Sequence, residues 1–88
     1  GYIETSEPSV ITAYHFLSNY LSTEHPEIIL DYIKLAFSQV VAGMNIRLVC
    51  GYYTDEAHMD VNYHLIAVIY FNLQMEPEEV RSLKLDVY

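Results

Sequence analysis

The spacing of hydrophobic residues predicts one helix near the start of the chain. Apolar residues recur there at intervals of three and four positions, which puts them on one helical face: Val10, Ala13, Tyr14, Leu17 and Leu21. The opposite face is polar: Thr12, His15, Ser18, Asn19 and Ser22. Ser6 and Pro8 are typical of a helix start, and Pro26 forbids continuation of the pattern. We therefore expect a helix over residues 8–24 whose apolar face packs on a sheet.

From Glu27 onward the chain alternates between apolar and polar positions, which is the pattern of half-buried strands. The first two predicted strands are Ile28–Ser38 and Asn45–Tyr52. The third has the apolar side Val61, Tyr63, Leu65, Ala67, Ile69, Phe71 and Leu73, and the fourth has Leu83, Leu85 and Val87. Met75–Glu79 is expected to separate these last two strands, and residues 1–5 could add a leader strand. Lys34 falls in phase with apolar neighbours, which predicts a β-bulge in the first strand.

The segment Gln39–Gly43 is expected to form the hairpin tip between the first two strands. Gly43 can adopt the positive φ that a tight turn needs. Val40 and Val41 are consecutive, so in a strand their side chains point to opposite faces and at least one faces solvent. Exposed apolar side chains at a tip are usually covered by a partner, which favours a binding loop over an ordinary hairpin.

The composition restricts the classes of partner. The chain of 88 residues has room for one domain, and it carries twelve acidic and four basic residues for a net charge of −8. This charge argues against nucleic acid or an anionic membrane as a partner. No apolar run approaches the roughly 20 residues of a membrane helix, and no signal-peptide pattern is present. The single cysteine, Cys50, excludes an internal disulfide.

The pentapeptide Gln39-Val40-Val41-Ala42-Gly43 resembles the first binding loop of the cystatins, the reversible protein inhibitors of papain-like cysteine proteases. It also follows one long helix and one strand, as it does in that family. The resemblance implies an α+β fold, with one long N-terminal helix wrapped by a curved antiparallel sheet of four to five strands. The absence of disulfides is similar to the stefins, the mainly intracellular branch, and so favours the cytoplasm over secretion.

The resemblance also implies that three segments enter the protease cleft as a wedge. The first is an N-terminal trunk at Gly1 and Tyr2, because the spacing from Gly1 to Gln39 is similar to that in stefins. The second is the hairpin at residues 39–43. The third is a second hairpin at Met75, Glu76 and Pro77. Secreted and plant cystatins carry Pro-Trp there and stefins usually Leu-Pro, whereas this chain has no Trp and places Glu76, Glu78 and Glu79 around the loop.

Other candidate chemistry has simpler explanations. Cys50 could be a nucleophile, but it alternates with Ile46 and Leu48 on an apolar face and is expected to be a buried small hydrophobe. A metal could be held by His58, Asp60 and His64, although such residues in an acidic hairpin are usually solvated. The aromatic pairs could form a ligand platform, but core and edge packing is the default: Tyr52, Tyr53, Tyr70 and Phe71. The three glutamates could meet a basic partner or simply keep the loop soluble.

We therefore expect a reversible, competitive, tight-binding inhibitor of papain-like, cathepsin-type cysteine proteases of the cell or of a host. It is expected to be neither an enzyme nor dependent on a cofactor or metal. The chain should be a monomer that can also form a domain-swapped dimer, as related stefins do. Val41→Asp or Gly43→Glu is expected to weaken protease binding at least about tenfold while leaving the fold intact, because a charge desolvated in the cleft costs several kcal/mol. The alternative is a cystatin-fold interaction or structural domain without inhibitory activity.

Overall fold

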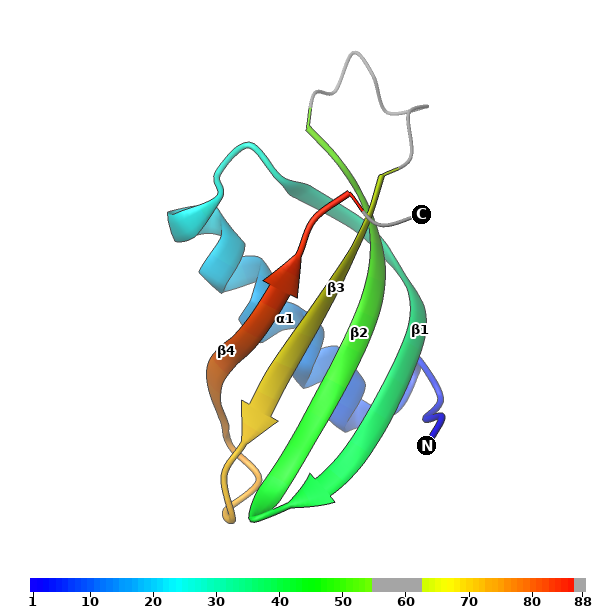
Figure 1. Cartoon of the computed structure of the whole chain (residues 1–88), viewed down its shortest axis with the longest axis vertical. Coiled ribbons are helices and arrows are strands. Elements are labelled where there is room, and N and C mark those ends of the chain that lie inside the picture. Colours follow the sequence, from blue (N-terminus) through cyan, green and yellow to red (C-terminus); the bar gives the residue numbers. More distant parts are fainter. Residues whose placement is uncertain (55–62, 87–88) are drawn as a thin grey trace.

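The computed structural model describes residues 1–54 and 63–86. It contains helix α1 (Pro8–Glu24) followed by four strands: β1 (Ile29–Val41), β2 (Gly43–Tyr53), β3 (Tyr63–Phe71) and β4 (Pro77–Lys84). The strands form one antiparallel sheet in the order β1-β2-β3-β4, and α1 lies across one face of it (Figure 1). The fold is α+β, with a helix followed by a four-stranded antiparallel sheet, as predicted and in agreement with a cystatin-like arrangement.

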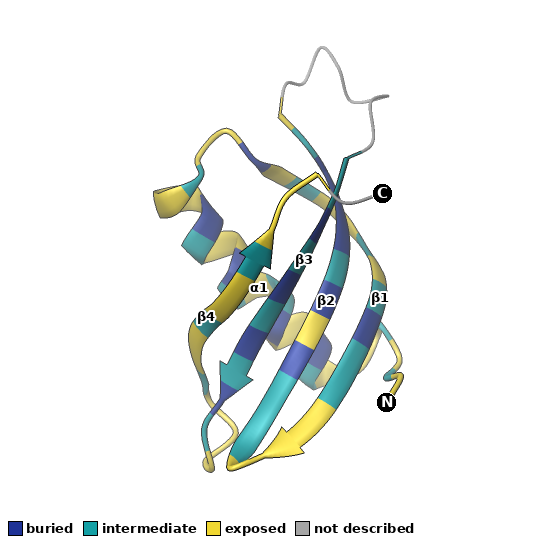
Figure 2. Ribbon diagram, viewed as in Figure 1, coloured by how far each residue is buried: buried dark blue, intermediate teal, exposed yellow. Residues whose placement is uncertain are grey.

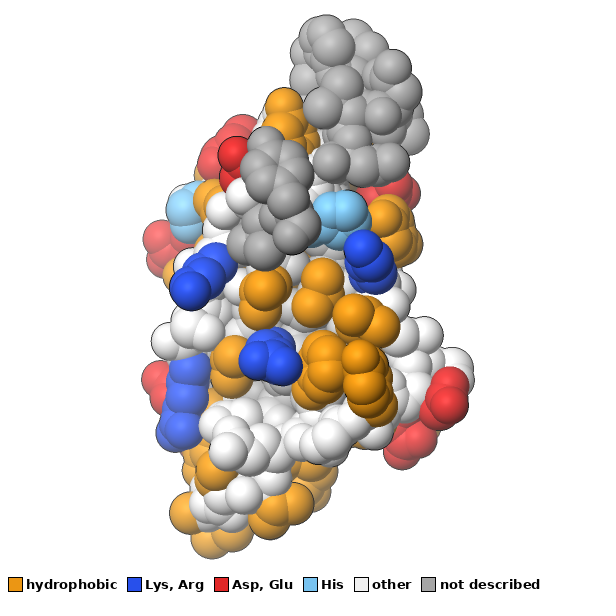
Figure 3. Space-filling model, turned by 45° about the vertical axis from the view of Figure 1, so that its right-hand side comes forward, with side chains coloured by type: hydrophobic (Ala, Val, Ile, Leu, Met, Phe, Trp, Pro, Cys, Tyr) orange, Lys and Arg blue, Asp and Glu red, His pale blue; other side chains and the backbone are white. Residues whose placement is uncertain are grey.

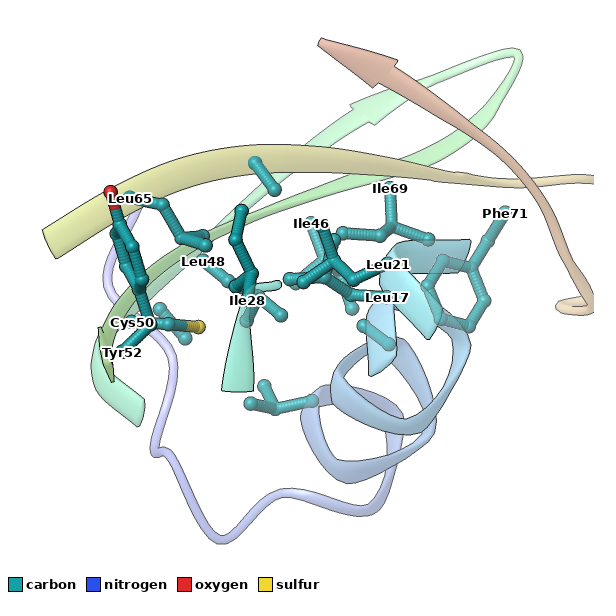
Figure 4. Packing of buried hydrophobic residues seen from close by; sticks show 14 residues of the cluster. Leu17, Leu21, Ile28, Ile46, Leu48, Cys50, Tyr52, Leu65, Ile69 and Phe71 are labelled. Carbon is teal, nitrogen blue, oxygen red and sulfur yellow. The ribbon is translucent and has the colours of Figure 1, made fainter. Parts of the chain in front are cut away.

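The core lies between α1 and the sheet. The helix contributes Val10, Ala13, Leu17 and Leu21, which are all buried. The central strands contribute alternate residues, each fully or almost fully buried: Ile46, Leu48, Cys50, Leu65, Ala67, Ile69 and Phe71. Leu17 and Leu21 of α1 point toward Ile46, Ile69 and Phe71 (Figure 4). The predicted helical and strand periodicities are therefore confirmed, and burial follows the same stripes in Figure 2.

Both edge strands contain bulges at charged residues. In β1 the pairing register shifts at two places and leaves Asp31 and Lys34 without a partner on β2, which confirms the predicted bulge. In β4 two similar shifts fall at Glu78 and Arg81. All four side chains are exposed. Bulges bend a strand, and charges on an edge discourage pairing with another sheet, so both edges are protected.

The strand ends differ from the sequence-based expectation. The strands β1 and β2 continue through the expected loop, so that Val41 pairs with Gly43 and Ala42 alone makes the turn. Strand β3 ends at Phe71, and Leu73 lies in the following loop rather than in the strand. Strand β4 begins at Pro77, inside the expected break, and ends before Leu85. Val61 and Val87 lie outside the described residues.

The leader makes one bridge with β1 rather than a full fifth strand. Tyr2 is paired with Phe37, and Gly1 and Ser38 exchange two backbone hydrogen bonds of 2.8 and 2.9 Å. The Ile3 amide adds a third to the Ala36 carbonyl at 3.1 Å. The start of the chain is thereby held on the β1 edge.

Candidate functional site

The two hairpins lie side by side at one end of the molecule (Figure 1). One joins β1 to β2 at Ala42, and the other joins β3 to β4 across residues 72–76. Met44, at the start of β2, pairs with Phe71, at the end of β3, so sheet pairing itself brings the tips together. The structure therefore brings together two of the three segments expected to bind, and the leader lies beside them along β1.

The first tip is tight because Gly43 permits a close approach of two strands. Its φ is 104°, and a Cβ placed on it would lie 2.2 Å from the Phe71 carbonyl oxygen. The Tyr70 hydroxyl, from β3, donates a hydrogen bond to the Ala42 carbonyl. The Arg81 guanidinium packs over the same Tyr70 ring at 3.8 Å from its centroid. The turn is thus anchored to the neighbouring strands as well as closed by its own pairing.

The second tip is organised by Asn72. Its side-chain Oδ1 accepts hydrogen bonds from the Gln74 and Glu76 amides, both at 3.0 Å. Its backbone carbonyl accepts a bond from the Met75 amide at 2.9 Å, and Met75 has a positive φ of 61°. Polar side chains that bond backbone amides a few residues ahead are a common way to fix a turn.

These turns leave a group of apolar side chains in solvent, here called the apolar tip: Val40, Val41, Leu73 and Met75. Their exposed fractions are 84%, 39%, 75% and 52%, respectively. Hydrophobic side chains gather at this end of the space-filling view (Figure 3). Tyr2, on the neighbouring leader, is 78% exposed and packs against Phe37, with 4.6 Å between ring centroids and the rings tilted by 37°. Exposed apolar groups that lie together, rather than singly, mark an interaction surface.

Leu73 was not among the predicted site residues. The strand ends at Phe71, but the alternation of apolar and polar residues continues to Leu73, so the sequence pattern predicts that Leu73 belongs to the strand. Among the predicted residues, Gln39, Ala42 and Glu76 are also exposed, while Pro77 is half-buried as the first residue of β4 and pairs with Phe71.

Acidic side chains flank the second tip. Glu76, Glu78 and Glu79 are exposed, and Glu79 accepts a hydrogen bond from the Arg81 Nε at 2.9 Å. The Asn72 Nδ2 donates to Glu78 at 3.3 Å. An exposed ion pair of this kind contributes at most about 1 kcal/mol, so these glutamates mainly set the local charge.

The other candidate chemistry does not form a site in the described residues. Cys50 is buried, and burial raises the pKa of its thiol to about 12, so it is not a nucleophile at neutral pH and packs as a small hydrophobe, as predicted. No group of three or more metal-ligating side chains occurs in residues 1–54 and 63–86. His64 is half-buried beside Tyr32, whose hydroxyl lies 3.2 Å from its Nε2, and His58 and Asp60 lie outside the described residues. The predicted aromatic pairs pack on opposite faces: Tyr52 and Phe71 are buried, whereas Tyr53 and Tyr70 are half-buried.

Comparison of the chain with models of protein families, with curated proteins and with solved structures gave no match. In the described part of the chain, the one helix is not long and apolar enough to cross a membrane. The likeness to the cystatins therefore rests on the pentapeptide Gln39–Gly43 and on the order of helix and strands.

Proposed function

We propose that this chain is a reversible, competitive protein inhibitor of papain-like cysteine proteases. The observation that carries the proposal is the apolar tip. Two adjacent hairpins, each held by side-chain hydrogen bonds, keep four apolar side chains in solvent at one end of the molecule. One of these hairpins has the pentapeptide that resembles the first binding loop of the cystatins. The leader with Gly1 and Tyr2 is held on the neighbouring β1 edge, which supports its inclusion in the proposed wedge.

The proposed mechanism is occlusion without chemistry. The apolar tip fills the cleft by contact, and the hairpin presents no peptide bond in attack geometry to the catalytic cysteine. Because the tip is already fixed by Gly43 and by the bond from Tyr70 to Ala42, little chain entropy is lost on docking. Burial of Val40 and Val41 contributes on the order of 3–5 kcal/mol to the binding free energy, before the entropy lost on docking is subtracted. That range separates micromolar from nanomolar binding, since each 1.4 kcal/mol is about tenfold in Kd.

The test is titration of active papain with the purified chain in a fluorogenic assay. Stoichiometric loss of activity that substrate reverses supports competitive inhibition. Full papain activity at micromolar excess of the chain, repeated with a cathepsin, would overturn the proposal.

A second candidate is an interaction or structural domain of the same fold without inhibitory activity. It is favoured by the second hairpin, where Glu76, Glu78 and Glu79 stand in solvent beside the apolar tip. A protease cleft with acidic walls would repel them. Replacing the three glutamates with glutamine separates the candidates. If the variant inhibits papain more strongly than the parent chain, the glutamate charge opposes docking of an inhibitor. If neither the variant nor the parent inhibits, the second candidate is supported.

A further inference from the structure

The sheet face opposite the helix differs in charge from the rest of the molecule. Three of the four basic residues lie on it: Arg47 pairs across the strands with Phe37 and Val68, Lys84 pairs with Ile66, and Arg81 covers Tyr70. The fourth, Lys34, is on the β1 bulge at its edge. Among the paired outward positions of the described strands, Glu79 is the one acid, and it forms an ion pair with Arg81. The acids Asp31 and Glu78 lie at bulges of the two edge strands. In Figure 3 basic side chains stand among hydrophobic ones on this surface.

A hollow opens on the same face near the β1 edge. Its volume is about 530 Å³, and it is lined mainly by outward residues of the first three strands: Phe37, Gln39, Asn45, Arg47 and Val68. Phe37 and Val68 flank Arg47 on either side in one cross-strand row. Gln39 and Asn45 form the next row toward the first tip. The hollow thus places a cation between two apolar side chains, with two carboxamides beside it.

The position and the contacts of the Arg47 guanidinium suit an anionic ligand. Its guanidinium lies 4.5 Å from the Phe37 ring centroid, which fixes the group while its N–H edges remain available. It forms no ion pair with the described residues, although the chain carries an excess of carboxylates. A fixed guanidinium binds a carboxylate through two parallel hydrogen bonds.

Asn45 gives a second, independent indication. Its Oδ1 is buried and accepts no hydrogen bond from the described residues. A buried polar atom without a partner lowers stability, so a polar residue kept at such a position requires an explanation. Carboxamides pair with the N–H and C=O groups of a peptide backbone, which a ligand in the hollow would supply once the Asn45 side chain reorients.

We propose that this hollow binds a short, extended acidic peptide segment of a partner protein. An aspartate or glutamate of the segment pairs with Arg47, its apolar neighbours pack on Phe37 and Val68, and its backbone meets Gln39 and Asn45. The net charge of −8 disfavours a polyanion and a second copy of the chain, whereas one or two carboxylates interact mainly with the nearby cations at physiological salt.

The test is a titration followed by NMR of the ¹⁵N-labelled chain with the peptide acetyl-Val-Glu-Leu-Glu-Val-amide. The proposal expects saturable binding, with shifts at β1, β2 and β3 residues of the hollow. The Gln-for-Glu peptide should bind at least about tenfold more weakly, and the Lys-for-Glu peptide not at all. Raising the salt concentration to 0.5 M should weaken the acidic peptide several-fold.

The matched variants are Arg47→Gln and Lys34→Gln, which change the net charge equally. Arg47→Gln should weaken binding at least about tenfold, while Lys34→Gln should change it less than about twofold. Gln39→Glu, at an exposed position, adds a repulsive charge and provides a second disruptive variant. The proposal would be overturned if Arg47→Gln and Lys34→Gln weakened peptide binding equally, or if the Glu and Gln peptides bound equally well. It would also be overturned by chemical shift changes confined to the apolar tip, or by a dimerisation that Arg47→Gln abolishes. No protease is present in these measurements, so their outcome is separate from that of the papain titration.

Discussion

Val40 and Val41 allow a charge to be added at the apolar tip with little effect on the core. Val40 is the more exposed of the two, so Val40→Asp should leave the thermal midpoint almost unchanged. In complex with papain the carboxylate would be desolvated without a partner, which costs several kcal/mol. We expect Val40→Asp and Val41→Asp each to raise the inhibition constant at least about tenfold.

The matched control for these variants is Leu85→Asp. Leu85 is as exposed as Val41 but lies beyond the other end of β4, away from both tips. Its substitution adds the same charge and should leave inhibition within about twofold of the parent. Unchanged inhibition by Val40→Asp, or an equal loss in Leu85→Asp, would contradict docking through the apolar tip.

A substitution of Gly43 does not test binding alone, because it also affects the fold. A Cβ at this position would meet the Phe71 carbonyl oxygen at 2.2 Å, and the backbone φ is positive, so any side chain forces the two strands apart. The expectation that Gly43→Glu leaves the fold intact is therefore wrong. We expect even Gly43→Ala to lower the free energy of unfolding by about 1–3 kcal/mol, measured in urea.

Gly1→Ala is the control for this loss, because a Cβ at Gly1 has no neighbour within 4 Å. It should leave the urea midpoint unchanged. A Gly43→Ala variant as stable as the parent would show that the tight approach of β2 to Phe71 is not required.

Residue patterns in the sequence were sufficient for the core but not for the whole site. The alternation of Ile46, Leu48 and Cys50 predicted their burial, because a strand inverts its side chains at each step. The same rule misplaced Leu73, since alternation continues past the point where the strand ends. What ends the strand is Asn72, whose side chain bonds amides two and four residues ahead. Such bonds depend on the path of the loop and leave no periodic signal.

At the scale of elements, the first hairpin is held to β3 by the hydrogen bond from Tyr70 to the Ala42 carbonyl. Tyr70→Phe removes this bond and should lower the free energy of unfolding by about 0.5–1.5 kcal/mol. It should also weaken papain inhibition, because a looser tip loses more entropy on docking. Hydrogen exchange of the hairpin amides should become faster than in the parent chain.

Tyr53→Phe is the matched control, since the Tyr53 hydroxyl makes no hydrogen bond with the described residues. It should leave both the exchange rates and inhibition unchanged. Identical behaviour of the two variants would remove the role assigned to Tyr70.

The sequence predicted the existence of the elements better than their ends. The β1 bulge was predictable because Lys34 conflicts with the apolar phase. The bulges at Glu78 and Arg81 were not, since β4 has few apolar positions from which a phase could be set. The hairpin tip was predicted as a five-residue loop because its valines cannot both face the core. In the structure they remain paired in β1, and the side chains of both are exposed to solvent.

At the scale of the whole molecule, the net charge of −8 conceals an uneven distribution. Basic residues occupy the outer face of the sheet, and acidic ones surround the second tip. The total charge still dominates the approach of two identical chains, which repel each other when salt is low. This repulsion favours a monomer and bears directly on the proposed domain swap.

We propose that the monomer can convert to a domain-swapped dimer by opening the first hairpin. β-Branched residues at a tight turn are expected to strain it. Val40 and Val41 do not, because both have regular strand pairing and neither has a positive φ. The conformational constraint lies instead at Ala42 and Gly43, where a single residue reverses the chain. Straightening this turn would allow α1 and β1 to exchange between two chains while most β1–β2 pairing is kept.

The swap should remove inhibition and should depend on salt. An extended hinge removes the first hairpin and with it the part of the apolar tip formed by Val40 and Val41. The dimer is therefore expected not to inhibit papain, whereas the monomer is expected to inhibit it. Because each chain carries a charge of −8, more dimer should form after partial heating in 0.5 M than in 0.05 M salt, where screening is weaker. The measurement is size-exclusion chromatography with light scattering, followed by a papain assay of each peak. A dimer that inhibits as well per chain as the monomer would refute the straightened hinge, and a dimer fraction that falls with salt would refute the role of charge repulsion.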